Sequence, residues 1–94
     1  MPQEVRSAAE LHPGDIYEDC AYHPCLCVRV EDDNVEGISL IDGSFPRSCS
    51  IAHCGVRRLT AEEAWEWRLT GPADVELEPQ HRWWDGTTPG LRTP

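Results

Sequence analysis

Turn signals recur at close intervals in the first half of this chain. "PGD" at 13–15, "EDDN" at 31–34 and "DGS" at 42–44 combine the proline, glycine, aspartate and asparagine that tight turns prefer. Short segments with strand signals lie between these turns. The spacing therefore predicts a mainly β fold built from short strands.

Strand signals are found in four segments. "IYEDCAY" (16–22) follows the first turn, "CLCVRV" (25–30) and "VEGISLI" (35–41) come next, and "CSIAHCGVRRL" (49–59) holds one or two further strands. The second segment alternates with period two, so its side chains divide between two faces. One face carries Leu26, Val28 and Val30, and the other carries Cys25, Cys27 and Arg29.

A helix is predicted after the strands. "TAEE" forms a capping box, with Thr60 as N-cap and Glu63 three residues later. Gly71, followed by a proline, ends the helix. Trp65 is expected to anchor this helix in the core, on the face that it shares with Ala61 and Leu69.

Several short strands followed by one helix predict a small barrel of about five short strands with one C-terminal α-helix. The stretch "LHPGDIYEDCAYHPCLCVRV" resembles the opening of small SH3-like barrels: a Pro-Gly-Asp turn, a strand, a loop and a second strand entered through proline. This resemblance covers about Leu11 to Asp42. It implies an SH3-like fold.

The ribonuclease toxins of bacterial toxin–antitoxin pairs are similar at the same point. They pair a Gly-Asp-hydrophobic start with a basic residue and proline before a valine-rich strand. His23 stands where those toxins carry arginine, and no serine or threonine directly follows the second strand, because "VRV" runs into "EDD". The resemblance therefore implies the barrel more than the activity.

The 94 residues are enough for one small domain. We expect a polar lead-in over 1–10, the barrel with its terminal helix over 11–70, and an extended or disordered tail over 71–94. A domain of this size buries about 60–65% of its unfolded surface, so a metal or disulfide would matter to its stability.

Net charge is −9, and all eight basic residues are arginine. This balance argues against nucleic acid or an anionic membrane as a general partner. Residues 43–61 contain no carboxylate and carry +3, so the remaining residues carry −12. We expect a protein partner or an anionic small ligand there. The candidate binding residues are Arg47, Arg57 and Arg58, together with Trp83 and Trp84 of the tail. The two tryptophans have an alternative role, in which they fold back over the domain.

No apolar run reaches the roughly 20 residues that span a bilayer, and the first ten residues lack the apolar region of a secretory signal. We expect no membrane association and a cytoplasmic protein, a compartment in which persistent disulfides are uncommon.

Two Cys/His clusters, "DCAYHPCLC" (19–27) and "CSIAHC" (49–54), raise the question of a metal site. Zinc prefers four thiolate or imidazole ligands, although the usual Cys-x2-Cys spacing is absent. The cofactor expectation is therefore either none or zinc. Its candidate ligands are Cys20, Cys25, Cys27, Cys49, His53 and Cys54.

Three other roles stay open for the cysteines. They can be disulfide partners, with one left over because five is odd, or small buried side chains. A single reactive thiol is the third role, since Cys54 precedes Arg57 and Arg58, and positive neighbours favour thiolate.

The sequence shows no complete set of catalytic residues, which favours a small non-catalytic binding module. If zinc is bound, the Cys/His site would stabilise this module. The alternatives are a toxin-like ribonuclease or cysteine-based enzyme on the same barrel, and an acidic inhibitor that mimics nucleic acid.

Overall fold

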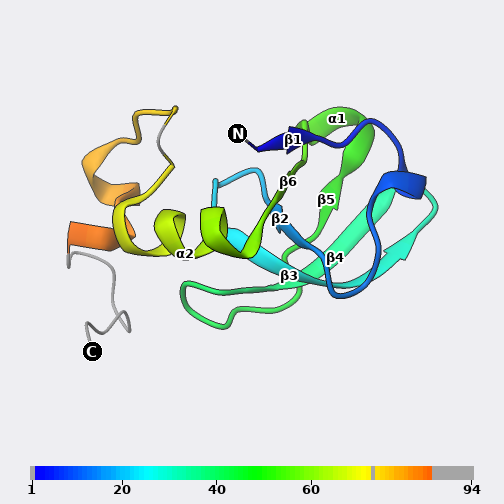
Figure 1. Cartoon of the computed structure of the whole chain (residues 1–94), viewed down its shortest axis with the longest axis horizontal. Coiled ribbons are helices and arrows are strands. Elements are labelled where there is room, and N and C mark those ends of the chain that lie inside the picture. Colours follow the sequence, from blue (N-terminus) through cyan, green and yellow to red (C-terminus); the bar gives the residue numbers. More distant parts are fainter. Residues whose placement is uncertain (1, 73, 86–94) are drawn as a thin grey trace.

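A computed structural model describes residues 2–72 and 74–85, with all side chains in these ranges except those of Cys54 and Asp85. The described chain forms a six-stranded antiparallel sheet in the order β1-β6-β2-β3-β4-β5, with helix α2 at one end (Figure 1). The strands are β1 (Gln3–Glu4), β2 (Ile16–Glu18), β3 (Pro24–Glu31), β4 (Asn34–Ser39), β5 (Cys49–Ser50) and β6 (Arg57–Leu59). The helical segments are η1 (Ala8–Glu10), α1 (Ile51–Cys54), α2 (Ala61–Thr70), η2 (Pro79–His81) and η3 (Trp83–Asp85).

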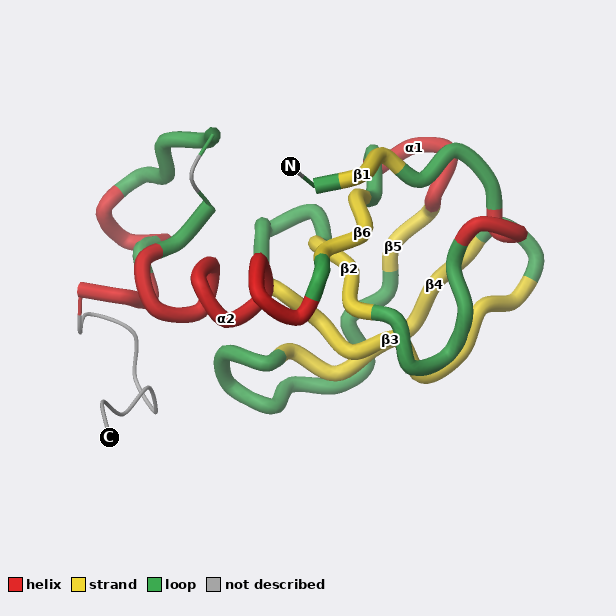
Figure 2. The backbone as a smooth tube through the Cα atoms, in the orientation of Figure 1, coloured by secondary structure: helices red, strands yellow, loops and turns green. Residues whose placement is uncertain are grey.

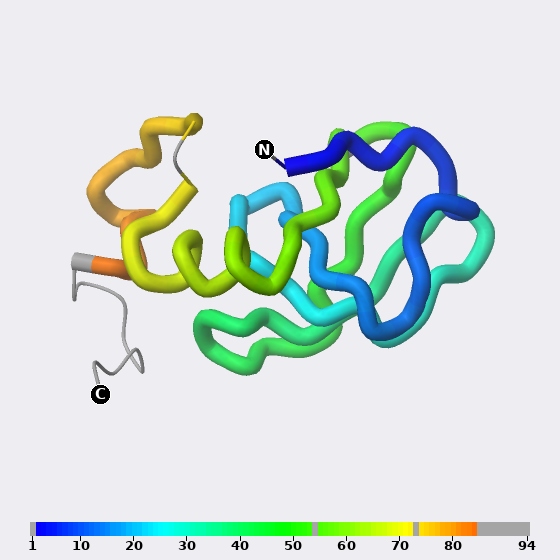
Figure 3. The backbone as a smooth tube through the Cα atoms, in the orientation of Figure 1, coloured from blue at the N-terminus to red at the C-terminus, as the bar shows by residue number. Residues whose placement is uncertain are grey.

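The predicted mainly β architecture with one principal helix is confirmed, but closure of a barrel is not found among the described strands. The sheet is open, with β1 and β5 at its two edges. The sixth strand comes from the lead-in, where Gln3 pairs with Arg58 and Glu4 with Arg57. Figure 3 shows this first segment running beside the chain around β6.

The sheet is nevertheless strongly curled. Residues 51–56 join β5 to β6, although β4, β3 and β2 lie between these two strands in the sheet. In a flat sheet they would stand about 19 Å apart, which is four spacings of roughly 4.8 Å. The helical turn of α1, at about 1.5 Å per residue, and the left-handed Gly55 keep this connection shorter than the roughly 18 Å that it would span with its other residues fully extended. The main core lies within the curl and consists of Val5, Leu11, Tyr17, Cys25, Cys27, Val35, Cys49, Ile51 and Val56.

Strand β3 follows the predicted alternation up to a bulge between Cys27 and Arg29. Before the bulge the cysteine face is buried, and Leu26 and Val28 are exposed. The bulge changes the register, so Val30 packs against the core instead of sharing the outer face. The prediction that Leu26, Val28 and Val30 share one face is therefore wrong for Val30.

Gly37 on β4 allows the sheet to pack tightly around Tyr17. A Cβ atom at this position would lie 2.4 Å from the Leu26 carbonyl oxygen and 2.7 Å from the Tyr17 side chain. The Tyr17 hydroxyl donates a 2.5 Å hydrogen bond to the Arg47 carbonyl oxygen. Burial raises the pKa of this hydroxyl, which therefore stays protonated.

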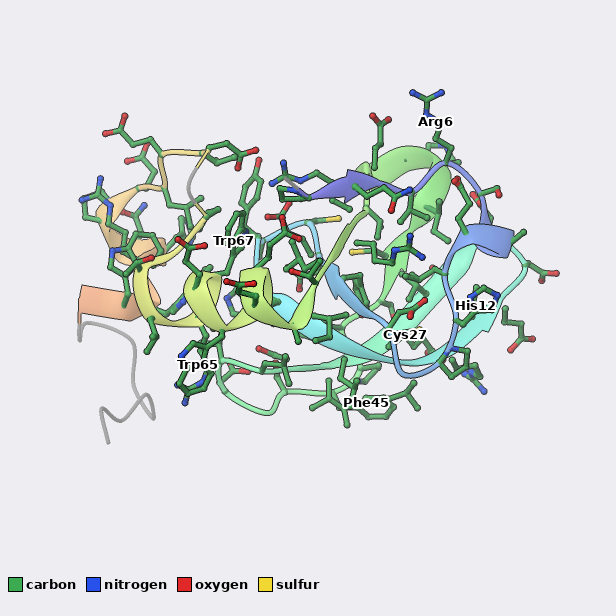
Figure 4. The ribbon with its side chains drawn as sticks, in the orientation of Figure 1. Arg6, His12, Cys27, Phe45, Trp65 and Trp67 are labelled. Carbon is green, nitrogen blue, oxygen red and sulfur yellow. The ribbon has the colours of Figure 1, made fainter. Side chains whose placement is uncertain are left out.

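Helix α2 has the predicted capping box, since the Thr60 side chain accepts from the Glu63 N–H and the Thr60 N–H donates to the Glu63 carboxylate. The predicted core anchor is wrong. Trp65 is 60% exposed and Trp67 is 4% exposed, and in Figure 4 the two side chains lie on opposite sides of the helix. Trp67 is held inward because its indole N–H donates to the buried Glu18 carboxylate at 2.8 Å.

The extended or disordered tail is predicted over 71–94, of which residue 73 and residues 86–94 lie outside the described residues. The segment η3 packs against α2, at the end of the molecule away from most of the sheet (Figure 2). Trp83, 1% exposed, forms a second apolar cluster with Ile41 and Leu77. The Trp83 side chain thus folds back over the domain.

Replacing Trp67 by phenylalanine should destabilise the protein by about 2 kcal/mol, because it removes a hydrogen bond to a buried carboxylate. The same replacement at the exposed Trp65 should change the free energy of unfolding by less than about 0.5 kcal/mol. Urea unfolding followed by far-ultraviolet circular dichroism measures both values. Equal destabilisation by the two variants would contradict this assignment of the helix faces.

Candidate functional site

Two adjacent carboxylates, Glu18 and Asp19, are buried where β2 ends. Each is bound by an arginine from the 43–61 segment, which contains no carboxylate of its own. The predicted binding residues Arg47 and Arg57 therefore have partners inside the domain.

Glu18 lies at the centre of the first group. Arg57 Nε donates to its Oε1 at 2.8 Å and Arg57 Nη2 to its Oε2 at 2.9 Å, while the Trp67 indole also donates to Oε2. The same guanidinium binds Asp74, with Nη1 2.5 Å from Oδ2. Hydrogen bonds to Asp74 and Glu18 raise the pKa of Arg57, so its guanidinium group keeps its proton and its positive charge.

Asp19 organises the loop between β2 and β3. Its Oδ2 accepts from Arg47 Nε at 2.7 Å, and its Oδ1 accepts from the backbone N–H groups of Ala21 and His23 at 2.9 and 3.0 Å. This carboxylate shapes the turn and also ties it to the segment that enters β5.

Arg58 projects to the other side of β6 from Arg57, because successive side chains of a strand alternate. It donates to the Glu10 carbonyl oxygen at 3.2 Å and to Gln3 Oε1 at 2.5 Å. All three arginines of the predicted patch thus bind oxygen atoms of the chain, at separate places. The positive stretch of sequence does not form one anion-binding surface among the described residues.

His23 is packed between polar and aromatic groups. Its Nδ1 lies 3.1 Å from Ser39 Oγ, and its ring meets Trp83 edge to face at 4.8 Å. Burial and then the charge of Arg47 lower the pKa of His23, against the opposing effects of Asp19 and Asp42. The neutral imidazole is therefore the form that the fold favours.

The candidate metal ligands are not gathered into one site. Cys20 and Cys49 meet, with their Sγ atoms 3.2 Å apart. Cys25 donates to the His23 carbonyl oxygen, and His53 is exposed, with Nδ1 3.0 Å from Ser50 Oγ. The Cys54 side chain lies outside the described ones. Within residues 2–72 and 74–85, no group of three or more histidine, cysteine or acidic side chains could hold a metal ion.

Cys25 and Cys27 fit the role of small buried side chains. Burial and then Asp19 raise the pKa of the Cys25 thiol, and burial and then Asp15 raise that of Cys27. Both thiols therefore stay protonated in the core near neutral pH.

Two hollows meet at Cys20, which is exposed. One is lined by Asp19, Cys20, Ala21, Pro46, Arg47, Ser48 and Cys49. The other is lined by Cys20, Ala21, Tyr22, Leu77 and His81. The Cys20 thiol can therefore be reached from solvent, while Cys49 beside it is buried.

The sequence reasoning missed a set of exposed hydrophobic side chains, which we call the exposed apolar face after Phe45 and Trp65, the two that share one side of the molecule. The set consists of the large hydrophobic side chains that have more than a third of their surface exposed: Leu26, Val28, Phe45, Trp65 and Leu69. Phe45 is 58% exposed, on a loop tied to β4 by hydrogen bonds from Arg47 N to Gly37 O and from Ser39 N to Ser44 O. In Figure 4, Phe45 and Trp65 lie along the same side of the molecule. The available sequence signal for Phe45 was an aromatic residue between turn residues, "DGSFP".

Comparisons with protein-family models, with curated proteins and with solved structures gave no match for this chain. Across the described ranges, no helix has the length and apolar character needed to cross a membrane.

Replacing Arg57 by methionine should destabilise the protein by about 3 kcal/mol, because Glu18 would remain buried without this counter-charge. Arg58, its neighbour in β6, binds neutral oxygen atoms, so Arg58→Met should cost about 1 kcal/mol or less. Urea denaturation of the two variants provides the comparison. If Arg58→Met lowered the free energy of unfolding as much as Arg57→Met, the Glu18–Arg57 ion pair would not be the source of this stability.

The lowered pKa of His23 makes stability depend on pH. Because the unfolded state binds the proton more tightly, the free energy of unfolding should fall as pH drops below about 6.5, the ordinary histidine value. His23→Asn should flatten this decline between about pH 7.5 and 5.5 in urea titrations, while the same change at the exposed His12 is the control. Parallel pH profiles for wild type and His23→Asn would refute this account.

Proposed function

We propose that this chain is a small non-catalytic interaction module that binds a protein partner through the exposed apolar face. The carrying observation is the exposure of two large aromatic side chains, Phe45 and Trp65, on one side of the domain. Aromatic side chains are enriched at protein interfaces, and tryptophan is among the residue types that most often dominate the binding energy.

Four of the five side chains of this face come from β3 and α2, and Phe45 comes from a loop that is hydrogen-bonded to β4. Leu26 and Val28 are two residues apart on β3 and both are exposed there. Trp65 stands on α2 with the Arg68 guanidinium 5.8 Å from the centre of its ring. Arg68 is itself held by a 3.1 Å hydrogen bond to the Leu40 carbonyl oxygen. Side chains held on a strand, a helix and a hydrogen-bonded loop lose less conformational entropy on binding than side chains on mobile loops.

The charge of the chain indicates the kind of partner. The apolar face is flanked on α2 by the exposed carboxylates Glu62 and Glu66, and the whole chain carries −9. An apolar patch rimmed by lysine or arginine would complement it, and acidic partners would be repelled. An anionic small ligand has less support, because the three arginines expected to bind it already contact oxygen atoms of the chain.

The SH3-like barrel remains the finer fold proposal. It is supported by the neighbour order β6-β2-β3-β4-β5, in which the last strand returns beside the first of the five, and by the short connection that curls β5 toward β6. Because one fold hosts many unrelated functions, this fold proposal is separate from the evidence of the apolar face.

The test is quantitative capture of partner proteins by the immobilised chain, with wild type compared with Phe45→Ser and Trp65→Ser. Both side chains are exposed, so these variants should fold normally, and each should reduce capture by about tenfold or more. Arg6→Ser, at an exposed position on the opposite side of the view in Figure 4, is the matched control and should capture as wild type does.

Unchanged capture by both aromatic variants would reject the apolar face. Sedimentation of the purified chain tests a second outcome, which is self-association. If the wild type is a dimer and Trp65→Ser is a monomer, the exposed apolar face binds a second copy of this chain, and a different protein is rejected as its partner.

A further inference from the structure

Cys20 and Cys49 come from segments far apart in the sequence and meet at the surface. Their Sγ atoms are 3.2 Å apart, and the Cys20 backbone N–H also points at Cys49 Sγ, at 3.3 Å. This sulfur–sulfur distance is about 1.2 Å longer than the roughly 2.05 Å of a disulfide bond. Bond formation therefore requires the two sulfur atoms to approach each other by about 1.2 Å.

A neighbouring ion pair fixes the two segments relative to each other. Asp19 precedes Cys20 directly, and Arg47 lies two residues before Cys49. The 2.7 Å contact between Arg47 Nε and Asp19 Oδ2 therefore holds both segments independently of the cysteines. The ion pair thereby keeps the two thiols close to each other.

The exposure of Cys20 distinguishes this pair from the other described cysteines. Cys20 is exposed between two hollows, whereas Cys25 and Cys27 are buried in the core. An oxidant in solution can therefore reach Cys20, and Cys49 is in position to react next.

We propose that Cys20 and Cys49 form a reversible dithiol–disulfide site that exchanges with small-molecule disulfides such as oxidised glutathione. This site is additional to the proposed binding face and does not depend on it. In this proposal Cys20 and Cys49 form the disulfide, and the buried Cys25 and Cys27 remain thiols.

The exchange proceeds in two balanced steps. The Cys20 thiolate attacks one sulfur of the small disulfide, a protein–glutathione disulfide forms, and one glutathione thiolate leaves. The Cys49 thiolate then attacks Cys20 Sγ and releases the second glutathione. The two protein thiols lose two electrons and two protons, and one molecule of oxidised glutathione becomes two of reduced glutathione.

The test uses the purified full chain, reduced and then equilibrated without oxygen in mixtures of oxidised and reduced glutathione. The intact mass should fall by two hydrogen atoms, and three of the five thiols should still react with a maleimide after unfolding. Excess reduced glutathione should restore all five. Cys20→Ser should abolish the mass loss, and Cys49→Ala should stop at a glutathione adduct on Cys20.

Cys27→Ser, at a buried site on β3, and Cys54→Ser are the controls, and both should keep the mass loss. Since Cys20 is exposed, its serine variant should fold, and circular dichroism checks the buried Cys49→Ala. Oxidation of Cys20→Ser as complete as that of wild type would overturn the proposal. Five reactive thiols after oxidation would also overturn it, as would a lasting wild-type glutathione adduct. Bound zinc that protects the thiols until chelator is added would replace it with a metal site.

Discussion

The arrangement of this domain depends on two buried carboxylates that are neighbours in the sequence, Glu18 and Asp19. A buried charge without a counter-charge costs several kcal/mol, so each must meet a cation when the chain folds. They meet different arginines, Arg57 on β6 and Arg47 before β5. The first pair fixes β6 beside β2, and the second fixes the loop that enters β5. One short stretch thereby determines where both distant halves of the 43–61 segment lie.

The same pairs explain the uneven charge along the chain. Two arginines of the segment without carboxylates, Arg47 and Arg57, pair with acidic residues that precede or follow it, whereas Arg58 binds neutral oxygen atoms. Asp74 completes the Arg57 group and thus connects the residues after α2 to β6. What remains on the surface is mainly acidic, interrupted by the apolar face around Phe45 and Trp65.

Local features were predictable from the sequence, and features decided by distant contacts were not. The Thr60 capping box, the three central strands and their turns follow from short-range chemistry. Trp65 and Trp67 fit helical spacing almost equally well, and the choice between them depends on Glu18 in a distant strand. The bulge at Cys27 and the pairing of Gln3 with Arg58 likewise need the assembled sheet. The spacing of five cysteines could not show that Cys20 and Cys49 would meet.

The tight curl of the sheet accounts for the unusual placement of cysteines inside and larger hydrophobic residues outside. Gly37 lies so close to the Tyr17 side chain that no Cβ atom fits between them, and the thiols of Cys25 and Cys27 belong to the same core. Leu26 and Val28 lie outside this core, which forfeits about 1.5–3 kcal/mol for each large side chain left exposed. A domain of 94 residues has little stability to spare, so its buried ion pairs gain importance. The same curl brings Cys49 of the edge strand β5 back to Cys20.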